Sequence, residues 1–242
     1  MPDAEAVTIT LDSGDRVSGL WLVPPSARAC LVLAHGAGAG MAHKSMATLA
    51  SGLAARDVAT LRYQFLYMER GSKRPDAPPL AHKVVRAAVA EAARRAGKLP
   101  LFAGGRSFGG RMTSQAQAIE PLPRVRGLVF FAFPLHPTGK PSDERAAHLS
   151  DVDIPMLFLS GSNDALASLD RLRPVVADLA EHATLKVIDG ADHSFHVPAK
   201  SGRKDADVLA EILDSAADWM TRFAFAPVIP GRGPDSKPPR RE

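Results

Sequence analysis

The sequence predicts one α/β domain, a mostly parallel central sheet with helices on both faces, and three observations support this fold class. Short apolar runs such as Ala29–Ala34 and Pro155–Ser160 lack alternation, as expected of strands that are buried on both faces. These runs alternate along the chain with segments of helical apolar spacing, which is typical of strand–helix–strand units. The length of 242 residues suits one large domain.

The chain opens with a predicted antiparallel hairpin. Val7–Leu11 and Arg16–Val23 are strand-like, and the turn-forming residues 12–15 separate them. The run Ala29–Ala34 follows as a buried strand. Apolar side chains then recur on one face of Lys44–Arg56, which predicts a helix.

The middle of the chain continues the alternation. Val58–Tyr63 is a predicted strand, and a loop rich in proline and charge, Tyr67–Pro79, leads to an alanine-rich helix over Ala81–Ala96. Leu99–Ala103 is the next strand, and a glycine-rich turn connects it to a helix that ends near Ile119.

The last part of the body repeats the pattern. Arg126–Phe133 and Pro155–Ser160 are predicted buried strands, and the connection between them is too short for a large cap domain. Leu169–Glu181 is a predicted helix, Thr184–Asp189 a strand and Lys204–Phe223 a long final helix.

Charge and cysteine content exclude other classes. Half of the formal net charge of +4 lies in residues 226–242, a proline-rich basic tail that we expect to be disordered. The predicted domain is therefore 1–225, and its near-neutral balance does not favour nucleic acid as a partner. The single cysteine, Cys30, cannot form an internal disulfide or a cysteine-built metal site.

Targeting signals and membrane spans are not apparent in the sequence. The first ten residues lack the basic and apolar regions of a secretory signal peptide. No apolar stretch approaches the roughly 18 residues that a bilayer span requires. We expect a cytoplasmic protein that needs no membrane partner.

A candidate nucleophile lies in the glycine-rich turn. Residues 105–109 (GRSFG) fit G-x-S-x-G and fall between a predicted strand and a predicted helix. That context produces a tight turn that exposes the central serine, Ser107, above the sheet. A glycine-rich turn with an incidental serine is the plainer alternative.

A serine nucleophile needs a base, and a base needs an orienting acid. His193 follows the predicted strand Thr184–Asp189 and lies after the serine in the chain, and His196 is its competitor. Asp164 is the first carboxylate after the strand that ends at Ser160, with Asp192 as the alternative acid. His82, His148 and His182 fall in predicted helices or polar loops, where we expect surface positions.

The loop HGAGAG, residues 35–40, is a candidate for stabilising negative charge. Two backbone N–H donors are needed for an oxyanion, and we expect them from Phe108 and from Ala37. His35 is expected to orient this loop. The remaining candidates for substrate contact are Arg106, Tyr63, Phe65, Tyr67, Leu135 and His136, together with His35.

Two other interpretations of these segments are weaker. Residues 38–45 (GAGMAHKS) approach a phosphate-binding G-x-x-x-x-G-K-[ST] loop, but His43 replaces the second glycine. Asp192, His193 and His196 could ligate a metal, but further ligands are not close in sequence. We therefore predict no cofactor and no metal.

These motifs, in the order Ser, Asp, His, resemble those of the α/β-hydrolase superfamily. More narrowly, the chain resembles the dienelactone-hydrolase-like branch that includes testis-expressed protein 30 and the KAT8 regulatory NSL complex subunit 3. The segments that carry the resemblance are HGAGAGMAHK, GGRSFGGR, FPLHPTGKP, GSNDAL and GADHSFHV, which span residues 35–197.

The resemblance implies an α/β-hydrolase fold and catalytic roles for Ser107, Asp164 and His193. A dienelactone hydrolase proper has a cysteine nucleophile, so Ser107 argues against dienelactone itself as the substrate. We expect a serine hydrolase that acts on a small ester or thioester through an acyl-enzyme. A catalytically silent binding or scaffold protein with the same fold is the alternative, and the sequence does not predict the oligomeric state.

Overall fold

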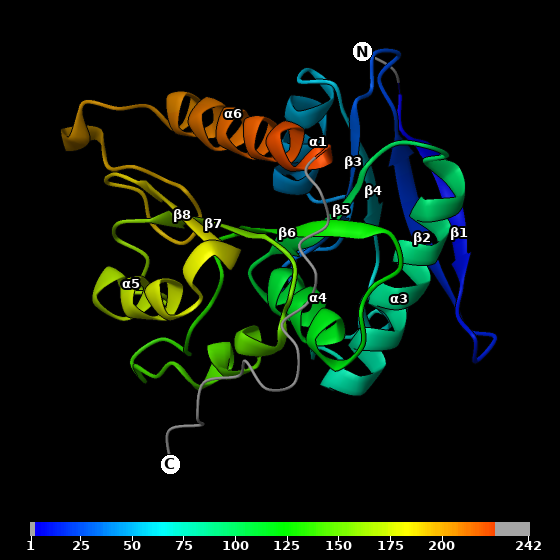
Figure 1. The fold of residues 1–242 in the computed structure, drawn as a ribbon, viewed down its shortest axis with the longest axis horizontal. Coiled ribbons are helices and arrows are strands. Elements are labelled where there is room, and N and C mark those ends of the chain that lie inside the picture. Colours follow the sequence, from blue (N-terminus) through cyan, green and yellow to red (C-terminus); the bar gives the residue numbers. More distant parts are fainter. Residues whose placement is uncertain (1–2, 226–242) are drawn as a thin grey trace.

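An eight-stranded sheet runs through the computed structural model, which describes residues 3–225 (Figure 1). The strand order is β1-β2-β4-β3-β5-β6-β7-β8. β1 (Glu5–Thr10) pairs antiparallel with β2 (Arg16–Leu22), and β2 pairs antiparallel with β4 (Val58–Tyr63). Every other neighbouring pair is parallel, so the mostly parallel sheet is confirmed.

The remaining strands form the parallel part of the sheet. They are β3 (Ala29–Ala34), β5 (Leu101–Arg106), β6 (Val125–Phe131), β7 (Met156–Gly161) and β8 (Ala183–Ile188). Every residue of β3, β4 and β7 is buried, which explains why their sequences are continuous apolar runs. The edge strand β8 is only partly buried.

Helices cover both faces of the sheet. α1 (Lys44–Ala54) and α6 (Asp205–Ala224) lie on one face, whereas α3 (Pro78–Arg95) and α4 (Phe108–Ile119) lie together on the other (Figure 1). α5 (Leu169–Asp178) packs near β8. Among the described residues, two large apolar clusters, one for each face, form most of the core, and a small third cluster surrounds Leu22.

Four short elements differ from the prediction. Three of them are α2 (Leu66–Glu69), η1 (Glu144–Asp151) and η3 (Ala199–Ser201), the last two being 3₁₀ segments. The fourth, the 3₁₀ segment η2 (Ala180–His182), begins inside the predicted helix Leu169–Glu181, because α5 already ends at Asp178. The connection between β6 and β7 contains only η1, so the expected absence of a large cap domain is confirmed.

The sheet extends further toward the glycine-rich turn than predicted. β5 ends at Arg106 and not at Ala103, because Gly104 and Gly105 pair with both β3 and β6. α3 begins at Pro78, three residues before the predicted start, since proline at the first helical position lacks only an N–H that would have no partner there.

The strand order reverses between β3 and β5. The chain leaves β3 for β4 on one side, and later adds β5 on the other side of β3. Loops that leave the carboxyl ends of β3 and β5 therefore diverge, and ligands of open α/β sheets bind at such a switch point.

Buried titratable side chains correct part of the sequence interpretation. His182 is buried, and the half-buried His148 hydrogen-bonds through Nε2 to Ser114 Oγ at 2.8 Å, so neither has the surface position that we expected. Cys30 is buried in β3, where desolvation raises the pKa of its thiol to about 12. This thiol is therefore not a nucleophile at neutral pH.

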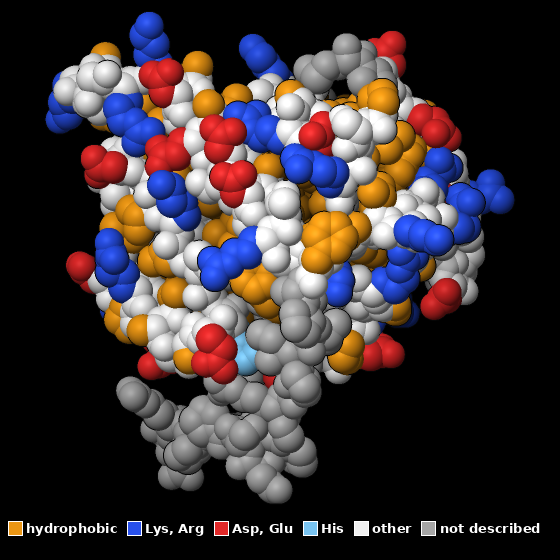
Figure 2. Space-filling view, turned by 45° about the horizontal axis from the view of Figure 1, so that its top comes forward, with side chains coloured by type: hydrophobic (Ala, Val, Ile, Leu, Met, Phe, Trp, Pro, Cys, Tyr) orange, Lys and Arg blue, Asp and Glu red, His pale blue; other side chains and the backbone are white. Residues whose placement is uncertain are grey.

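The surface carries side chains of both charges. Basic and acidic side chains are interspersed on the face shown in Figure 2. Among residues 3–225, no helix combines the length and the apolar character needed to cross a bilayer. The predicted proline-rich tail, 226–242, lies outside the described residues.

Candidate active site

Ser107 occupies a strained turn between β5 and α4. Its backbone angles are φ 48° and ψ −114°, a sparsely populated combination that costs a residue with a Cβ about 1–3 kcal/mol. Hydrogen bonds on both sides maintain this conformation. Ser107 N–H donates to the Phe131 carbonyl at 3.0 Å, and Arg111 N–H donates to the Ser107 carbonyl at 3.1 Å.

The glycines that flank Ser107 allow α4 and β5 to approach β3. A Cβ at Gly109 would lie 2.7 Å from Ala34 Cβ, and a Cβ at Gly105 would lie 2.7 Å from the same atom and collide with the Ala34 carbonyl oxygen. These separations are shorter than any ordinary carbon–carbon contact. The G-x-S-x-G spacing is thus a packing requirement of this turn.

Ser107, His193 and Asp164 form one hydrogen-bonded chain. His193 Nε2 lies 2.8 Å from Ser107 Oγ. On the other side of the ring, His193 Nδ1 lies 2.8 Å from Asp164 Oδ2 and 3.0 Å from Oδ1. A carboxylate accepts the Nδ1 proton, which leaves Nε2 as the acceptor for the serine hydroxyl.

Asp164 is held at the carboxyl end of β7. Its side chain has no exposed surface, and Leu166 N–H donates to Oδ1 at 2.8 Å. The preceding residue, Asn163, donates its N–H to the Ala191 carbonyl at 2.9 Å and so connects this loop to the one that carries His193. The Leu166 contact was not predicted, because no sequence pattern marks a backbone donor.

The alternative acid and base have other partners. Asp192 Oδ1 accepts from the N–H groups of Ser194 at 2.7 Å and His196 at 3.0 Å, so it shapes the loop around His193. His196 Nδ1 lies 2.8 Å from Asp205 Oδ2, an ion pair that raises the imidazole pKa. Neither Asp192 nor His196 therefore belongs to the hydrogen-bonded series Ser107–His193–Asp164.

The glycine-rich loop after β3 lies beside Ser107. A Cβ at Gly36 would be 3.8 Å from Ser107 Cβ. Within the described part of the chain, neither Ala37 N–H nor Phe108 N–H donates a hydrogen bond to a protein group. Phe108 is the first residue of α4, where helical N–H groups are free to bind negative charge.

His35 and two side chains from elsewhere hold this loop. His35 is buried, accepts the Phe65 N–H through Nε2 at 3.1 Å, and has Nδ1 2.8 Å from the Gly36 carbonyl. Burial lowers its pKa, which favours the neutral ring that this arrangement requires. Tyr67 Oη accepts from Gly38 N–H at 3.4 Å, and Gln64 Oε1 accepts from Met41 N–H at 2.8 Å.

Several expected substrate contacts lie beneath the site. Tyr63, Phe65 and Leu135 have no exposed surface and Tyr67 is only 2% exposed, so these side chains support the site and do not form the lining that we predicted. His136 is also buried, and its N–H donates to the Leu166 carbonyl at 3.2 Å. These side chains are buried by elements that are distant in sequence, so their burial was not visible in the local sequence pattern.

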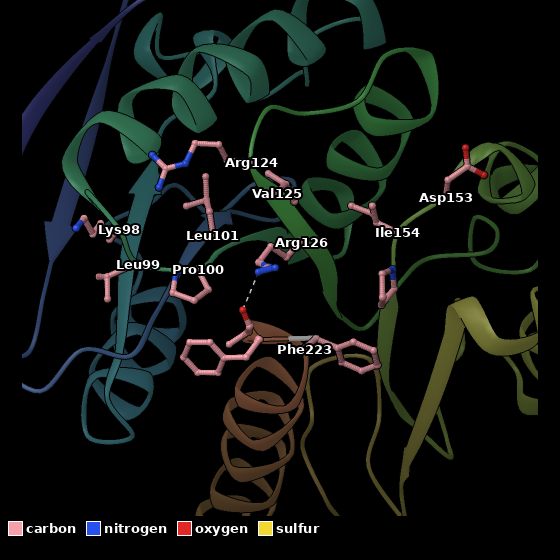
Figure 3. Close-up of a pocket in the computed structure, with 13 residues that line it drawn as sticks. Lys98, Leu99, Pro100, Leu101, Arg124, Val125, Arg126, Asp153, Ile154 and Phe223 are labelled. Carbon is pink, nitrogen blue, oxygen red and sulfur yellow. Dashed lines mark hydrogen bonds between the residues drawn. The ribbon is translucent and has the colours of Figure 1, made fainter. Parts of the chain in front are cut away.

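Two cavities lie at opposite edges of the sheet. The larger, about 610 Å³, surrounds the amino ends of β5 and β6, where Arg126 donates to the Ala224 carbonyl at 2.8 Å (Figure 3). The smaller, about 340 Å³, lies at the carboxyl edge between α1 and α6 and includes Arg106 and Ser194, the chain neighbours of Ser107 and His193. The smaller cavity therefore adjoins the candidate site.

Within residues 3–225, no group of three or more His, Cys, Asp and Glu side chains is arranged to bind a metal ion. The groups available at this edge of the sheet are a serine hydroxyl, an imidazole hydrogen-bonded to it and a buried carboxyl group. With two free N–H donors beside them, these groups can support nucleophilic attack on a carbonyl.

Solved structures share this fold over nearly the whole chain. A dienelactone hydrolase from Anabaena variabilis superposes with a TM-score of 0.74 at 21% identity, covering 92% of this chain and 99% of that one. A serine hydrolase without a lid from Xanthomonas campestris gives a TM-score of 0.70 at 19% identity, covering 94% and 99%. An esterase domain from Rhodothermus marinus gives 0.70 at 15% identity, covering 92% and 100%.

The sequence itself matches a family. A sequence model of the alpha/beta hydrolase domain family covers residues 27–221. The dienelactone-hydrolase-like resemblance is thereby supported, whereas the finer similarity to testis-expressed protein 30 and the chromatin-complex subunit stays a prediction. This chain belongs to the alpha/beta hydrolase domain family.

Proposed function

We propose that the protein is a serine hydrolase that cleaves a small ester or thioester through an acyl-enzyme on Ser107. The observation that supports this most strongly is the hydrogen-bonded chain from Asp164 through His193 to Ser107 Oγ. Each member leaves the carboxyl end of a different strand, and the nucleophile has the strained backbone of an exposed elbow.

Acylation begins with attack of Ser107 Oγ on the substrate carbonyl carbon. His193 Nε2 takes the hydroxyl proton, and Asp164 stabilises the imidazolium while it keeps Nδ1 protonated. The carbonyl π electrons move onto oxygen and form a tetrahedral oxyanion. The free N–H groups of Phe108 and Ala37 are the donors proposed for this charge.

Collapse of the intermediate breaks the bond to the leaving group. His193 Nε2 donates its proton to the departing alcohol or thiol, and the acyl group remains on Ser107 Oγ. A water molecule then attacks the acyl-enzyme, with His193 as the general base. The products are a carboxylic acid and the free serine.

Covalent labelling provides the first test. We expect a fluorophosphonate probe to modify Ser107 in the intact chain and to leave Ser107→Ala unmodified, as read by peptide mass spectrometry. Short p-nitrophenyl esters should be hydrolysed by the unchanged protein. Turnover by Ser107→Ala at the unchanged rate would refute the proposed site.

The silent scaffold alternative predicts a different outcome. A binding protein with this fold would fold normally but neither react with the probe nor hydrolyse esters above the buffer rate. The intact hydrogen-bonded chain favours the enzyme, since a fold kept only for binding has no requirement for all three groups.

A further inference from the structure

The cavity at the carboxyl edge is lined by cations close to the proposed nucleophile. Arg106 is the last residue of β5 and directly precedes Ser107, and Lys44 is the first residue of α1. Both line the cavity of about 340 Å³, together with Ser194, the neighbour of His193. Ser107 and His193 are not in its lining, but each is the direct chain neighbour of a residue that is, and consecutive Cα atoms are about 3.8 Å apart, so the cavity adjoins the proposed nucleophile.

Neither cation has an anionic partner of its own. Among residues 3–225, the side chains of Arg106 and Lys44 form no salt bridge and no hydrogen bond. Three other partly buried arginines, Arg86, Arg95 and Arg203, each pair with a glutamate. Such pairing is favoured for a partly desolvated cation, because leaving it without a partner reduces stability. This cost applies to Arg106, whereas Lys44 is exposed and adds only its charge.

Arg106 also differs from Arg111, the other half-buried arginine near the elbow. The Arg111 guanidinium lies 6.0 Å from the centroid of the Phe108 ring, so it has an aromatic partner. No such ring contact is present for Arg106 within the described residues. Burial lowers the pKa of Arg106, and the charge of Asp192 partly offsets this.

Two carboxylates, Asp205 in the cavity lining and Asp192 nearby, form no ion pair with Arg106 or Lys44. Asp205 forms the ion pair with His196 and accepts Val197 N–H at 3.0 Å. Asp192 attracts Arg106 at a distance, but its Oδ1 accepts the two N–H groups of the His193 loop. The guanidinium and ammonium groups thus remain available to an anion from outside the chain.

From this cavity and its two unpaired cations we propose that the substrate carries a carboxylate, which Arg106 and Lys44 bind while its ester or thioester carbonyl lies at Ser107. This inference rests on the proposed function and adds the substrate class. Arg106 would supply hydrogen bonds that a planar guanidinium directs at both oxygens of a carboxylate, and Lys44 would contribute a mobile charge at the rim.

Paired substrates of matched size test the proposal. The 4-nitrophenyl monoester of glutaric acid and 4-nitrophenyl valerate differ mainly in a terminal carboxylate on the acyl side. 4-Acetoxybenzoate and its methyl ester place the same difference on the leaving group. We expect the unchanged protein to favour the acid in at least one pair by about tenfold or more in kcat/KM, as for one charge-assisted hydrogen bond.

Three variants identify the residues responsible. Arg106→Gln should abolish the preference for the acid, read as the ratio of kcat/KM for the acid to kcat/KM for its neutral partner, and Lys44→Glu should reduce or reverse this preference. Arg173→Gln, which removes an exposed arginine on α5, is the control for total charge and should preserve the preference. Equal kcat/KM for acid and neutral partner in both pairs would overturn the proposal but leave the hydrolase assignment intact.

A binding measurement separates the two proposals if no ester is turned over. Glutarate should raise the Tm of the unchanged protein and of Ser107→Ala, and butyrate at equal ionic strength should not. Arg106→Gln should abolish the shift. A shift without activity retains the anion site and refutes the hydrolase, whereas absence of a shift together with absence of activity refutes both. Equal shifts in the unchanged protein and Arg106→Gln would contradict the assigned residues.

Discussion

The strained backbone of Ser107 predicts an inversion of the ordinary stability order of alanine and glycine. Both Ser107→Ala and Ser107→Gly remove the hydroxyl that bonds to His193, but only glycine relieves the cost of φ 48°, ψ −114°. That cost is about 1–3 kcal/mol for a residue with a Cβ. Against it stands about 0.5–1 kcal/mol that glycine loses through its greater freedom in the unfolded chain. We expect Ser107→Gly to be more stable than Ser107→Ala by about 1 kcal/mol.

Urea unfolding, followed by circular dichroism, measures this difference directly. Both variants should be inactive, and for a chain of this size the glycine form should melt about 2–4 °C higher. Ser215, within α6, provides the matched control, because there glycine should be less stable than alanine by about 1 kcal/mol. An alanine variant at position 107 that equals or exceeds the glycine variant in stability would refute the role assigned to strain.

Two further predictions concern Asp164 and His148. Asp164→Asn should lower kcat/KM on the order of 10³–10⁴-fold, because an amide does not fix the tautomer of His193. Asp192→Asn should retain much more activity, and ester hydrolysis by the two purified variants compares the two acids. Burial and nearby cations lower the pKa of His148 from 6.5 to about 4, so the unfolded chain binds this proton first. The stability that neutral His148 contributes is complete above about pH 6.5 and is lost as pH falls toward 4, by up to about 3 kcal/mol. His148→Gln, which can still donate to Ser114, should lack this pH-dependent part of the free energy of unfolding when urea unfolding at pH 7 is compared with pH 4. An equal decrease of the unfolding free energy in both proteins would contradict the lowered pKa.

The strands of the parallel sheet were predictable because burial on two faces imposes a continuous apolar run. Ala29–Ala34 and Val58–Tyr63 agree with β3 and β4 at both ends. The elbow was predictable for a related reason, since G-x-S-x-G reflects local packing against Ala34. Chain order then restricted the acid and the base to loops after particular strands.

Features that depend on contacts between distant segments were harder to predict from the sequence. His148 and Ser114 are 34 residues apart, and no local pattern links them. The enclosure of Phe65 depends on how neighbouring elements close over it, so periodicity could not separate lining from support. The glycines of β5 resemble a loop in composition and are strand only because they pair with two neighbours.

The parallel sheet also divides the surface into two edges with different tolerance to change. Ser107, Asp164 and His193 all follow carboxyl ends of strands that are joined in one continuous series, β5 to β8. The loops that enter those strands, such as 97–100 and 121–124, lie at the opposite edge. Insertions, affinity tags or surface attachment at that opposite edge should leave the proposed chemistry undisturbed, which makes it the natural place to tether or extend this protein.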